Sequence, residues 1–454
     1  MSPFVPLLAA LALLAGPAFA ETRMLAPGED VAAAIARAAP GDEILLGAGH
    51  HAGPVTIERA LTLRGEPGAI LEGDGTGHVI TVTGTGITVT GLTIRGSGSD
   101  RTEIDAGIFL DREAREILIE DNILEGNLNG IRVQGAAGSV VRGNHITGRT
   151  GRQAEAGNGI AIWNAPGTLI ENNVIRFGRD GIFSNVSKQD IYRGNRMEKT
   201  RFAIHYMYTN NSVIEGNVSV DNTVGYAMMF SNRLRIRDNV SDGDRDHGLL
   251  LNSVNYSEIT GNRVIGRALP EARWFTSEAG AAADSHMGGA DVVEARASRG
   301  GMRSGPEKCL FVYNANNNQL RDNWFEGCGI GLHFTAGAAG NTLSGNAFIS
   351  NQVQVKYVGT RDLDWSEDGR GNYWSDNAAF DLDGDGIADA AYRPNDIIDQ
   401  VMWTAPQARL LVTSPAVQVI RWAQARFPAT LPGGVVDSAP LMAPPPLPSP
   451  EVNP

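Results

Sequence analysis

Several things are scarce in this chain, and each shortage narrows what it can be. Only two cysteines occur among 454 residues, so the fold is not built on a disulfide network. Aromatic residues make up 7%, which is low for a large globular enzyme. Lys and Arg number 38 against 51 Asp and Glu, giving a net charge of −13. Nucleic-acid binding needs a basic surface to neutralise phosphates, so we expect no nucleic-acid partner and better tolerance of a metal ion or a cationic partner.

Long apolar runs are missing except at the N-terminus. Residues 1–20, MSPFVPLLAALALLAGPAFA, end in the A-x-A pattern of a signal-peptidase site, Ala18-Phe19-Ala20. The apolar run is short for a membrane span of roughly 20 residues. We therefore expect a cleaved secretion signal rather than a retained membrane helix, and an exported, soluble mature chain.

What the chain does contain is a repeat of about 22 residues. Segments such as GIAIWNAPGTLIENN, GIFSNVSKQDIYRGN and AIHYMYTNNSVIEGN share an apolar start, a turn and a strand that closes on Asn. This period is too short for a propeller blade and lacks leucine-rich-repeat spacing, so it predicts an all-β fold, the coils of a parallel β-helix. The closing residues, separated mostly by steps of 22 or 23, are Asn122, Asn144, Asn173, Asn195, Asn217, Asn239, Asn262, Asn323 and Asn346.

Stacked coils place residues one period apart above one another, about 4.7–4.9 Å apart. Asn suits the turn because it tolerates left-handed backbone and can bond to its copies in neighbouring coils. Alternation along the strands predicts core positions at Ile160, Ile182, Ile204, Ile162, Ser184 and Tyr206. Residues 28–39 are expected to form a short helix that caps the N-terminal end. We divide the chain into a signal (1–20), a β-helix with an insertion near 267–306 (21–358), a metal-loop and helical docking segment (359–427), and a mobile Pro-rich tail (428–454).

Two methionines separated by one period form the first candidate site. Met207 and Met229 are 22 residues apart, so we expect both side chains on the outer face of adjacent coils, with His205 beside the first. His333 falls in the His205 column several coils away, and His247 lies near the start of the coil after Met229. Thioethers are soft ligands that prefer Cu(I), and imidazole also suits copper. The alternatives are methionine packing beneath a loop or partner, and an apolar docking patch.

An acidic loop forms the second candidate site. Asp381, Asp383, Asp385 and Asp389 follow the pattern D-x-D-x-D-G-x-x-D, in which alternating carboxylates can surround a hard cation. Position 12 of an EF-hand loop would be Tyr392 rather than Glu, so this is not a standard EF-hand. We expect a structural calcium or magnesium ion, with a solvated acidic turn as the alternative.

The two cysteines are the third candidate. Cys309 and Cys328 are 19 residues apart, close to one coil, so a disulfide between coils is expected in an oxidising compartment. The register does not align them directly, which leaves free thiols or soft-metal ligands as alternatives.

A short cluster, Asp244-Arg245-Asp246-His247, is similar to the acid-and-histidine groups of β-helical enzymes that act on uronic acids. Such chemistry needs a base, an acid and a neutralising cation in one groove. The alternative is a surface turn.

Three stretches carry a resemblance to a known family: FVYNANNN (311–318), LHFTAG (332–337) and GRGNYWSDNAAFDLDGDGIADAAYRPNDIIDQVMWTAPQ (369–407). Over most of residues 21–440 the chain resembles the NosD family of periplasmic nitrous oxide reductase maturation proteins. The long insertion near 267–306 is unusual for that family.

The resemblance implies a right-handed β-helix in the periplasm, held at the membrane by an ABC transporter of NosF and NosY subunits. It also implies cooperation with a copper chaperone lipoprotein, NosL, in assembling the copper-sulfide centre of nitrous oxide reductase. ATP hydrolysis is expected on a partner chain, because this sequence has no GxxxxGK[ST] phosphate loop.

Two functions therefore compete. The first is a non-enzymatic metallochaperone that receives Cu(I), or a sulfur species, and passes it to the apo-reductase; Trp403 and Trp422 in the apolar C-terminal segment fit docking to a transporter. The second is an exported polysaccharide lyase or epimerase acting on uronic-acid polymers, which would need a groove of charged and aromatic residues along several coils. Beyond the cluster at residues 244–247 we find no such run, so we favour the first.

Overall fold

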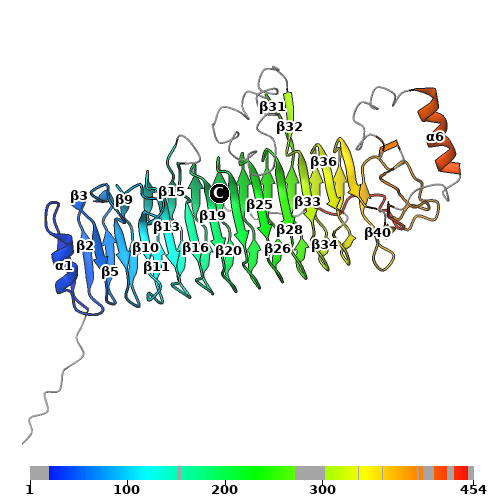
Figure 1. The fold of residues 1–454 in the computed structure, drawn as a ribbon. Helices are drawn as coiled ribbons and strands as arrows, with labels where there is room; N and C mark the ends of the chain where they lie inside the picture. The colour runs from blue at the N-terminus through cyan, green and yellow to red at the C-terminus, as the bar shows by residue number, and fades with distance from the viewer. Residues whose placement is uncertain are drawn as a thin grey trace, which may run out of the picture.

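The computed structural model shows an elongated solenoid with a helix at each end (Figure 1). It describes residues 20–150, 155–270, 302–335, 337–359, 361–395, 398–399, 401, 414–426 and 434–447. The expected signal at 1–20 therefore lies almost wholly outside the described residues. Within the described ranges, none of the helices has the length and apolarity that a membrane crossing requires.

Each coil contributes one strand to each of three parallel sheets, which confirms the predicted all-β parallel β-helix. Sheet 1 contains β1 (Thr22–Leu25), β2 (Glu43–Leu46), β5 (Thr62–Gly65), β8 (Thr88–Thr90), β11 (Leu118–Glu120), β14 (Val140–Arg142), β17 (Leu169–Glu171), β20 (Ile191–Arg193), β23 (Val213–Glu215), β26 (Arg235–Arg237), β29 (Glu258–Thr260), β34 (Gln319–Arg321) and β37 (Thr342–Ser344). Sheet 2 contains β4 (Val55–Ile57), β7 (Ile80–Val82), β10 (Ala106–Leu110), β13 (Asn129–Gln134), β16 (Ile160–Trp163), β19 (Asp180–Asn185), β22 (Phe202–Met207), β25 (Val224–Met229), β28 (His247–Asn252), β33 (Lys308–Tyr313), β36 (Ile330–Thr335) and β39 (Val353–Val358). Sheet 3 contains β3 (Gly49–Ala52), β6 (Ala69–Glu72), β9 (Thr93–Arg95), β12 (Ile123–Glu125), β15 (His145–Thr147), β18 (Val174–Arg176), β21 (Arg196–Glu198), β24 (Val218–Val220), β27 (Val240–Asp242), β30 (Arg263–Ile265), β35 (Trp324–Glu326), β38 (Ala347–Ile349) and β41 (Tyr373–Trp374).

One continuous apolar core fills the space between the three sheets. The predicted inward positions are all fully buried: Ile160, Ile182, Ile204, Ile162, Ser184 and Tyr206. No single coil could bury these side chains alone, so stacking supplies the core.

A column of asparagines runs along one corner of the solenoid, as the closing Asn of each repeat predicts. The side-chain Nδ2 of each donates to the Oδ1 of the next; for Asn195 and Asn217 the distance is 3.0 Å. The column runs from Asn122 to Asn346 and continues to Asn372, to which Asn346 donates at 2.8 Å. These buried amides provide hydrogen-bond partners for interior backbone groups that would otherwise be unsatisfied.

The N-terminal end is covered by α1 (Val31–Arg37), within the predicted 28–39. The Asp30 side chain caps it by accepting from the Ala33 N–H at 2.8 Å, which satisfies one of the free donors of the first turn. Val31, Ala34 and Ile35 point into the core, so the helix closes the apolar interior.

The C-terminal end differs from the prediction in two ways. The β-helix does not stop at 358, because β41 pairs with β38 and Asn372 extends the asparagine column. The Pro-rich segment 428–454 is also not a free tail where the structure describes it. Its β42 (Val435–Val436) pairs with β40 (Leu363–Asp364), and Asp437 is fully buried.

The remaining elements project from the solenoid or lie beyond it. The insertion near 267–306 begins and ends in antiparallel arms, β31 (Arg267–Pro270) and β32 (Met302–Gly305), which stand out from the side of the coils (Figure 1). Residues 271–301 lie outside the described residues. Helix α6 (Pro415–Arg426) lies past the last coil.

Candidate metal centre on sheet 2

The candidate copper ligands come from neighbouring strands of sheet 2. The register pairs Met207 of β22 with Met229 of β25, and His205 with Ala227. Ile204 and Tyr206 alternate with these positions and are fully buried in the core, so His205 and Met207 face outward. The structure thus places the two methionines side by side on adjacent coils, and both are half-buried.

Met229 also contributes to packing on this outer face. A small cluster of Val224, Ala227 and Leu250 lies there, and Met229 packs against it. The packing alternative therefore has a physical basis for Met229, whereas Met207 does not belong to this cluster.

His205 is held by a buried ion pair. Its Nδ1 lies 3.2 Å from Oδ2 of Asp180 at the start of β19. Arg201 donates to both oxygens of the same carboxylate, from Nε to Oδ1 at 2.8 Å and from Nη2 to Oδ2 at 2.7 Å. Burial alone would raise the pKa of Asp180, but the His205 hydrogen bond and the Arg201 charge outweigh burial and hold that pKa at about 2.

Asp180 and Arg201 were not predicted from the sequence. Asp180 precedes His205 by 25 residues, which is more than one period, and the register pairs it with Phe202 instead. The sequence signal that could have identified Asp180 is its position at the start of the strand that precedes the His205 strand. A side chain can cross between neighbouring columns, and vertical alignment alone does not show this.

The other two histidines form a separate group. His247 and His333 lie on either side of Phe311, at ring-centroid distances of 5.5 and 4.9 Å. Burial lowers the pKa of His247, and the positive charge of Lys308 lowers it further. The pKa of His333 falls to about 3, first through burial and then through Lys308 and Lys356. Because the lysines repel cations, this group is a poorer metal site than the His205 region.

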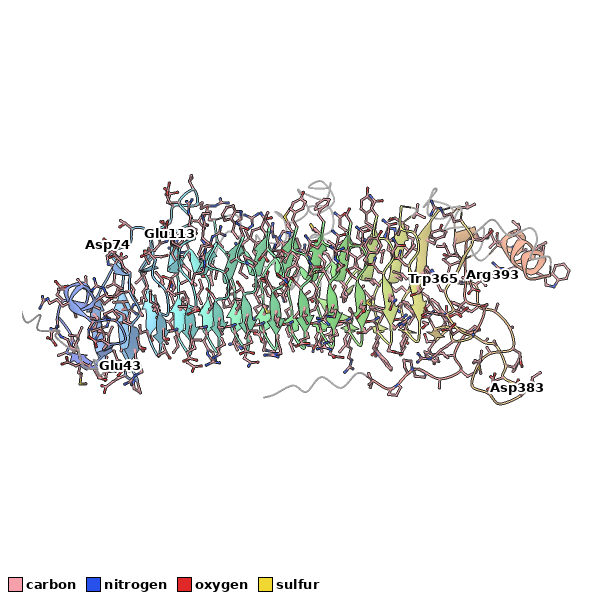
Figure 2. The ribbon with its side chains drawn as sticks, turned by 90° about the horizontal axis from the view of Figure 1, so that it is seen from below. Glu43, Asp74, Glu113, Trp365, Asp383 and Arg393 are labelled. Atoms are coloured by element: carbon pink, nitrogen blue, oxygen red, sulfur yellow. A yellow bond between two sulfur atoms is a disulfide. The ribbon has the colours of Figure 1, made fainter. Side chains whose placement is uncertain are left out.

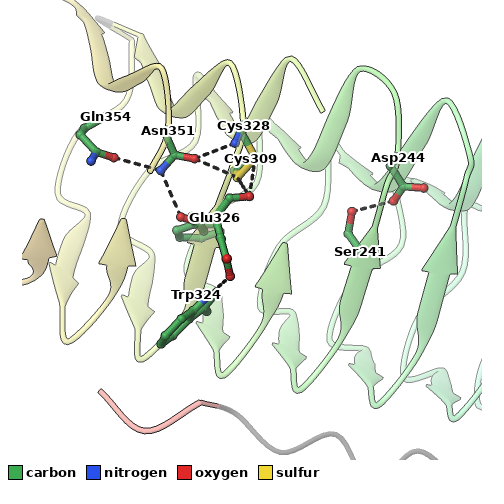
Figure 3. Close-up of a disulfide and its surroundings, with 9 residues drawn as sticks. Ser241, Asp244, Cys309, Trp324, Glu326, Cys328, Asn351 and Gln354 are labelled. Carbon is green, nitrogen blue, oxygen red and sulfur yellow. Dashed lines mark hydrogen bonds between the residues drawn. A yellow bond between two sulfur atoms is a disulfide. The ribbon is translucent and has the colours of Figure 1, made fainter. Parts of the chain in front are cut away.

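The first acid of the cluster at residues 244–247 lies inside the solenoid. The Asp244 carboxylate is fully buried inside the solenoid and accepts from Ser219 Oγ at 2.7 Å. It also accepts from Ser241 Oγ at 2.6 Å (Figure 3). Arg245 pairs with its neighbour Asp246. An inward carboxylate bonded to serines cannot reach a polymer outside the coils, so the cluster lacks the arrangement that the lyase hypothesis needs.

The acidic loop lies in the irregular segment beyond the last coil, where Asp383 is seen in Figure 2. Oxygens of Asp381, Asp383 and Asp385 lie within 4.8 Å of one another. Backbone N–H groups of Gly384 and Gly386 donate to Asp381 at 2.6 and 2.9 Å and hold the loop tightly curved.

The fourth predicted acid has a different role in this loop. Asp389 accepts from the Leu382 N–H at 2.8 Å and is not part of the three-carboxylate group. Tyr392, at the position of the missing EF-hand glutamate, donates its hydroxyl to Asp376 at 2.8 Å. The loop therefore gathers three carboxylates, fewer than predicted.

Cys309 and Cys328 are joined in a disulfide, with their Cα atoms 5.6 Å apart (Figure 3). Cys309 lies in β33, and Cys328 lies at the corner that leads from β35 into β36. The bond therefore links one coil to the start of the next, although the two positions are not aligned by register. Both cysteines are fully buried, so neither is available to a metal.

The sheets and the asparagine column define the class of protein: a right-handed parallel β-helix. Residues 78–190 match a family model described as a right handed beta helix region. A hyperthermoactive exopolygalacturonase from Thermotoga maritima superposes with a TM-score of 0.51 and 11% identity, covering 74% of this chain and 92% of the other. The pre-mature gene product 12 of bacteriophage phi29 gives a TM-score of 0.52 at 11% identity, covering 74% and 49%. At such identities, these likenesses show the fold alone.

Comparison of the sequence with known proteins establishes the family. Residues 143–379 match the family model described as periplasmic copper-binding protein (NosD). A protein of Stutzerimonas stutzeri named probable ABC transporter binding protein NosD is 39% identical over 87% of this chain and 86% of its own length. A protein of Pseudomonas aeruginosa with the same name is 38% identical, with 87% of each chain covered. The chain belongs to the NosD family, as its resemblance predicted.

Proposed function

We propose that this chain is a periplasmic accessory protein that binds Cu(I) on the outer face of sheet 2. In this proposal it delivers the copper, or a sulfur species, for assembly of the copper-sulfide centre of nitrous oxide reductase. Its family is described as periplasmic copper-binding, which supports copper as the cargo, and two relatives are named ABC transporter binding proteins, which supports work beside a transporter. Copper is the cargo in this proposal and not a resident cofactor.

The observation that carries the proposal is the pairing of Met207 with Met229, beside His205. Two half-buried thioethers beside a buried imidazole form a soft donor set without a carboxylate among the ligands, which favours Cu(I) over hard cations. A half-buried position also suits transfer, because a partner can approach the ligands from outside the coils.

The test is titration of the purified protein with Cu(I) against a competing chelator. We expect Met207→Leu combined with Met229→Leu to weaken binding at least tenfold. Leucine keeps the apolar volume that Met229 contributes to its cluster, so a loss reports the sulfur atoms rather than the packing. The matched control is Met24→Leu with Met442→Leu, two exposed methionines outside this face. Unchanged affinity in the first double variant would remove these ligands from the proposal.

We also propose that the C-terminal end docks on the transporter, formed by NosF and NosY, while NosL and the apo-reductase exchange copper with sheet 2. Helix α6 leaves Val419 and Trp422 each 63% exposed, three residues apart on one face of the helix. A large exposed apolar pair of this kind favours contact with another protein. Trp403, the other predicted docking residue, lies outside the described residues.

Co-purification from detergent-solubilised membranes tests the docking. Val419→Asp with Trp422→Asp should remove most of the ATPase-containing complex from the preparation, while the isolated protein keeps its Cu(I) affinity. Tyr256→Asp is the matched control, because Tyr256 is 62% exposed on the side of the solenoid. Equal recovery of the complex with the wild type, the α6 double variant and the Tyr256→Asp control would contradict docking through α6.

For the acidic loop we propose a calcium or magnesium ion held by Asp381, Asp383 and Asp385. Three carboxylates that converge in a tight loop repel one another, and a divalent cation would relieve that repulsion. Calorimetric titration with calcium, then magnesium, should show one site that Asp381→Asn with Asp383→Asn abolishes. Asp74→Asn, an exposed carboxyl near the opposite end, should leave the binding unchanged (Figure 2). Absence of heat from either cation would leave the loop as a solvated turn.

A further inference from the structure

We propose that Asp180 is a positioning residue for the metal ligand His205, and that it sets which imidazole nitrogen is available to copper. This inference rests on the proposed function, because it concerns a ligand of the proposed copper site. It assigns a role to a buried contact that neither the sequence pattern nor the repeat explains.

The first step is hydrogen-bond chemistry. An ionised carboxylate only accepts hydrogen bonds, so the 3.2 Å contact between Asp180 Oδ2 and His205 Nδ1 requires a proton on Nδ1. In the neutral imidazole the lone pair then lies on Nε2. Histidines that bind metals commonly donate their other ring N–H to a carboxylate in this way, which fixes the ring and makes it a better ligand.

The second step is charge. Arg201 donates to both oxygens of Asp180, and this paired contact balances the charge of the carboxylate. The histidine adds a directed hydrogen bond and a ligand nitrogen to a pair whose charges are already balanced.

The third step is rigidity. The guanidinium of Arg201 lies over the Phe202 ring at 4.4 Å, which holds the ion pair in place. The His205 ring contacts Phe202 at a centroid distance of 4.7 Å and Phe183 at 5.1 Å. The His205 side chain is 10% exposed, so it is enclosed on several sides and keeps a small contact with solvent. Ligands held this firmly by their neighbours need little reordering when the metal arrives.

The direct test is the tautomer of His205 in the metal-free protein, read from ¹⁵N shifts of labelled histidine at fixed pH. His205→Gln identifies the signal among the eight histidines. We expect the wild type to carry its proton on Nδ1. In Asp180→Asn the amide can donate to Nδ1 as well as accept from it, so a mixture of tautomers is expected. Its Cu(I) affinity should fall 10- to 100-fold, the range typical of losing such a partner.

Asp190→Asn is the matched control, since Asp190 is also a fully buried carboxyl but bonds to Thr168 and Tyr192 on sheet 1. It should change neither the tautomer nor the affinity. If Asp180→Asn does not fold, the wild type still decides, because a proton on Nε2 overturns the proposal.

The affinities separate the two proposals. If His205→Gln weakens copper binding and Asp180→Asn does not, the copper site stands and the role of Asp180 is overturned. If His205→Gln leaves the Cu(I) affinity unchanged, His205 is not a ligand. The proposed roles of His205 as a ligand and of Asp180 as its positioning residue are then both wrong.

Discussion

At the scale of single residues, the carboxyl of Asp244 is fully buried within the solenoid. It takes the place that Asn222 holds one coil earlier, and the Asn222 N–H donates to Asp244 Oδ1 at 2.9 Å. Two serine hydroxyls satisfy its other oxygen. A carboxyl has therefore replaced an amide in a second internal column, which makes the stability of this coil depend on pH.

Burial raises the pKa of Asp244 to about 7, although hydrogen bonds from Ser241, Ser219 and Asn222 partly oppose it. In the unfolded chain the pKa is about 3.9. Between these values the folded protein binds the extra proton, so the free energy of unfolding falls as pH rises from about 4 to about 7.

We expect Asp244→Asn to remove most of this dependence and to stabilise the protein at pH 8 by on the order of 1–3 kcal/mol. Urea unfolding at a series of pH values measures this. Asp190 has its pKa raised to about 7 by burial as well, so only the difference between variant and wild type is informative. Parallel curves for the two proteins would contradict the expectation.

Individual contacts could be predicted where the two residues are one period apart and therefore stack on adjacent coils. Met207 and Met229 are one period apart, so their pairing follows from counting. Asp244 is also one period after Asn222, and this spacing could have placed it inside the solenoid; the motif at 244–247 drew attention to a surface role instead. Asp180 could not be found by counting, because its side chain contacts a residue of another column.

At the scale of elements, the asparagine column joins the coils more specifically than the apolar core does. Asn217 accepts from the Asn195 Nδ2 and donates to the Tyr192 carbonyl and to Asn239 Oδ1, at 2.9–3.0 Å. The period predicted this column as far as Asn346. Its last member, Asn372, follows after 26 residues, and the irregular step hid it from a count based on 22.

We expect Asn217→Ala to lower the free energy of unfolding by about 2–4 kcal/mol. The reason is that it leaves the buried Asn195 backbone N–H without its acceptor and removes one hydrogen bond each from the Asn195 side-chain amide and the Tyr192 carbonyl. An unsatisfied buried group costs about 1–3 kcal/mol. Chemical denaturation measures the loss. Gln319→Ala removes an exposed amide and should change stability by less than about 0.5 kcal/mol. A similarly small effect at Asn217 would show that the column is replaceable.

At the scale of the whole molecule, both ends of the solenoid must be closed, because an open coil exposes apolar side chains and unpaired strand edges. The N-terminal closure is a local helix, and the helical pattern of residues 28–39 was enough to predict it. The C-terminal closure comes from a segment far along the chain, since β40 pairs with β42 across a gap of about 70 residues. The Pro-rich composition of this segment predicts mobility. Composition alone cannot show that the segment pairs with residues at the end of the solenoid.

Asp437 is the centre of this closure. Its Oδ2 accepts from the Asn372 N–H at 2.7 Å and from the Trp374 indole N–H at 2.8 Å. It therefore satisfies the last asparagine of the column. Asp437→Ala should leave both donors unpaired and loosen the end of the solenoid.

Repeat proteins are stabilised mainly between neighbouring coils, so this damage should stay local. We expect Asp437→Ala to reduce hydrogen-exchange protection in β38, β39 and β41, while strands near α1 keep theirs. Asp383→Ala, measured without divalent cations, removes an exposed carboxyl from the same end and should leave the pattern unchanged. Loss of protection along the entire solenoid would mean that its coils unfold as one unit, and the closure would then stabilise the proposed copper site from a distance. Local loss would leave sheet 2 intact around His205 and make copper binding independent of the C-terminal end.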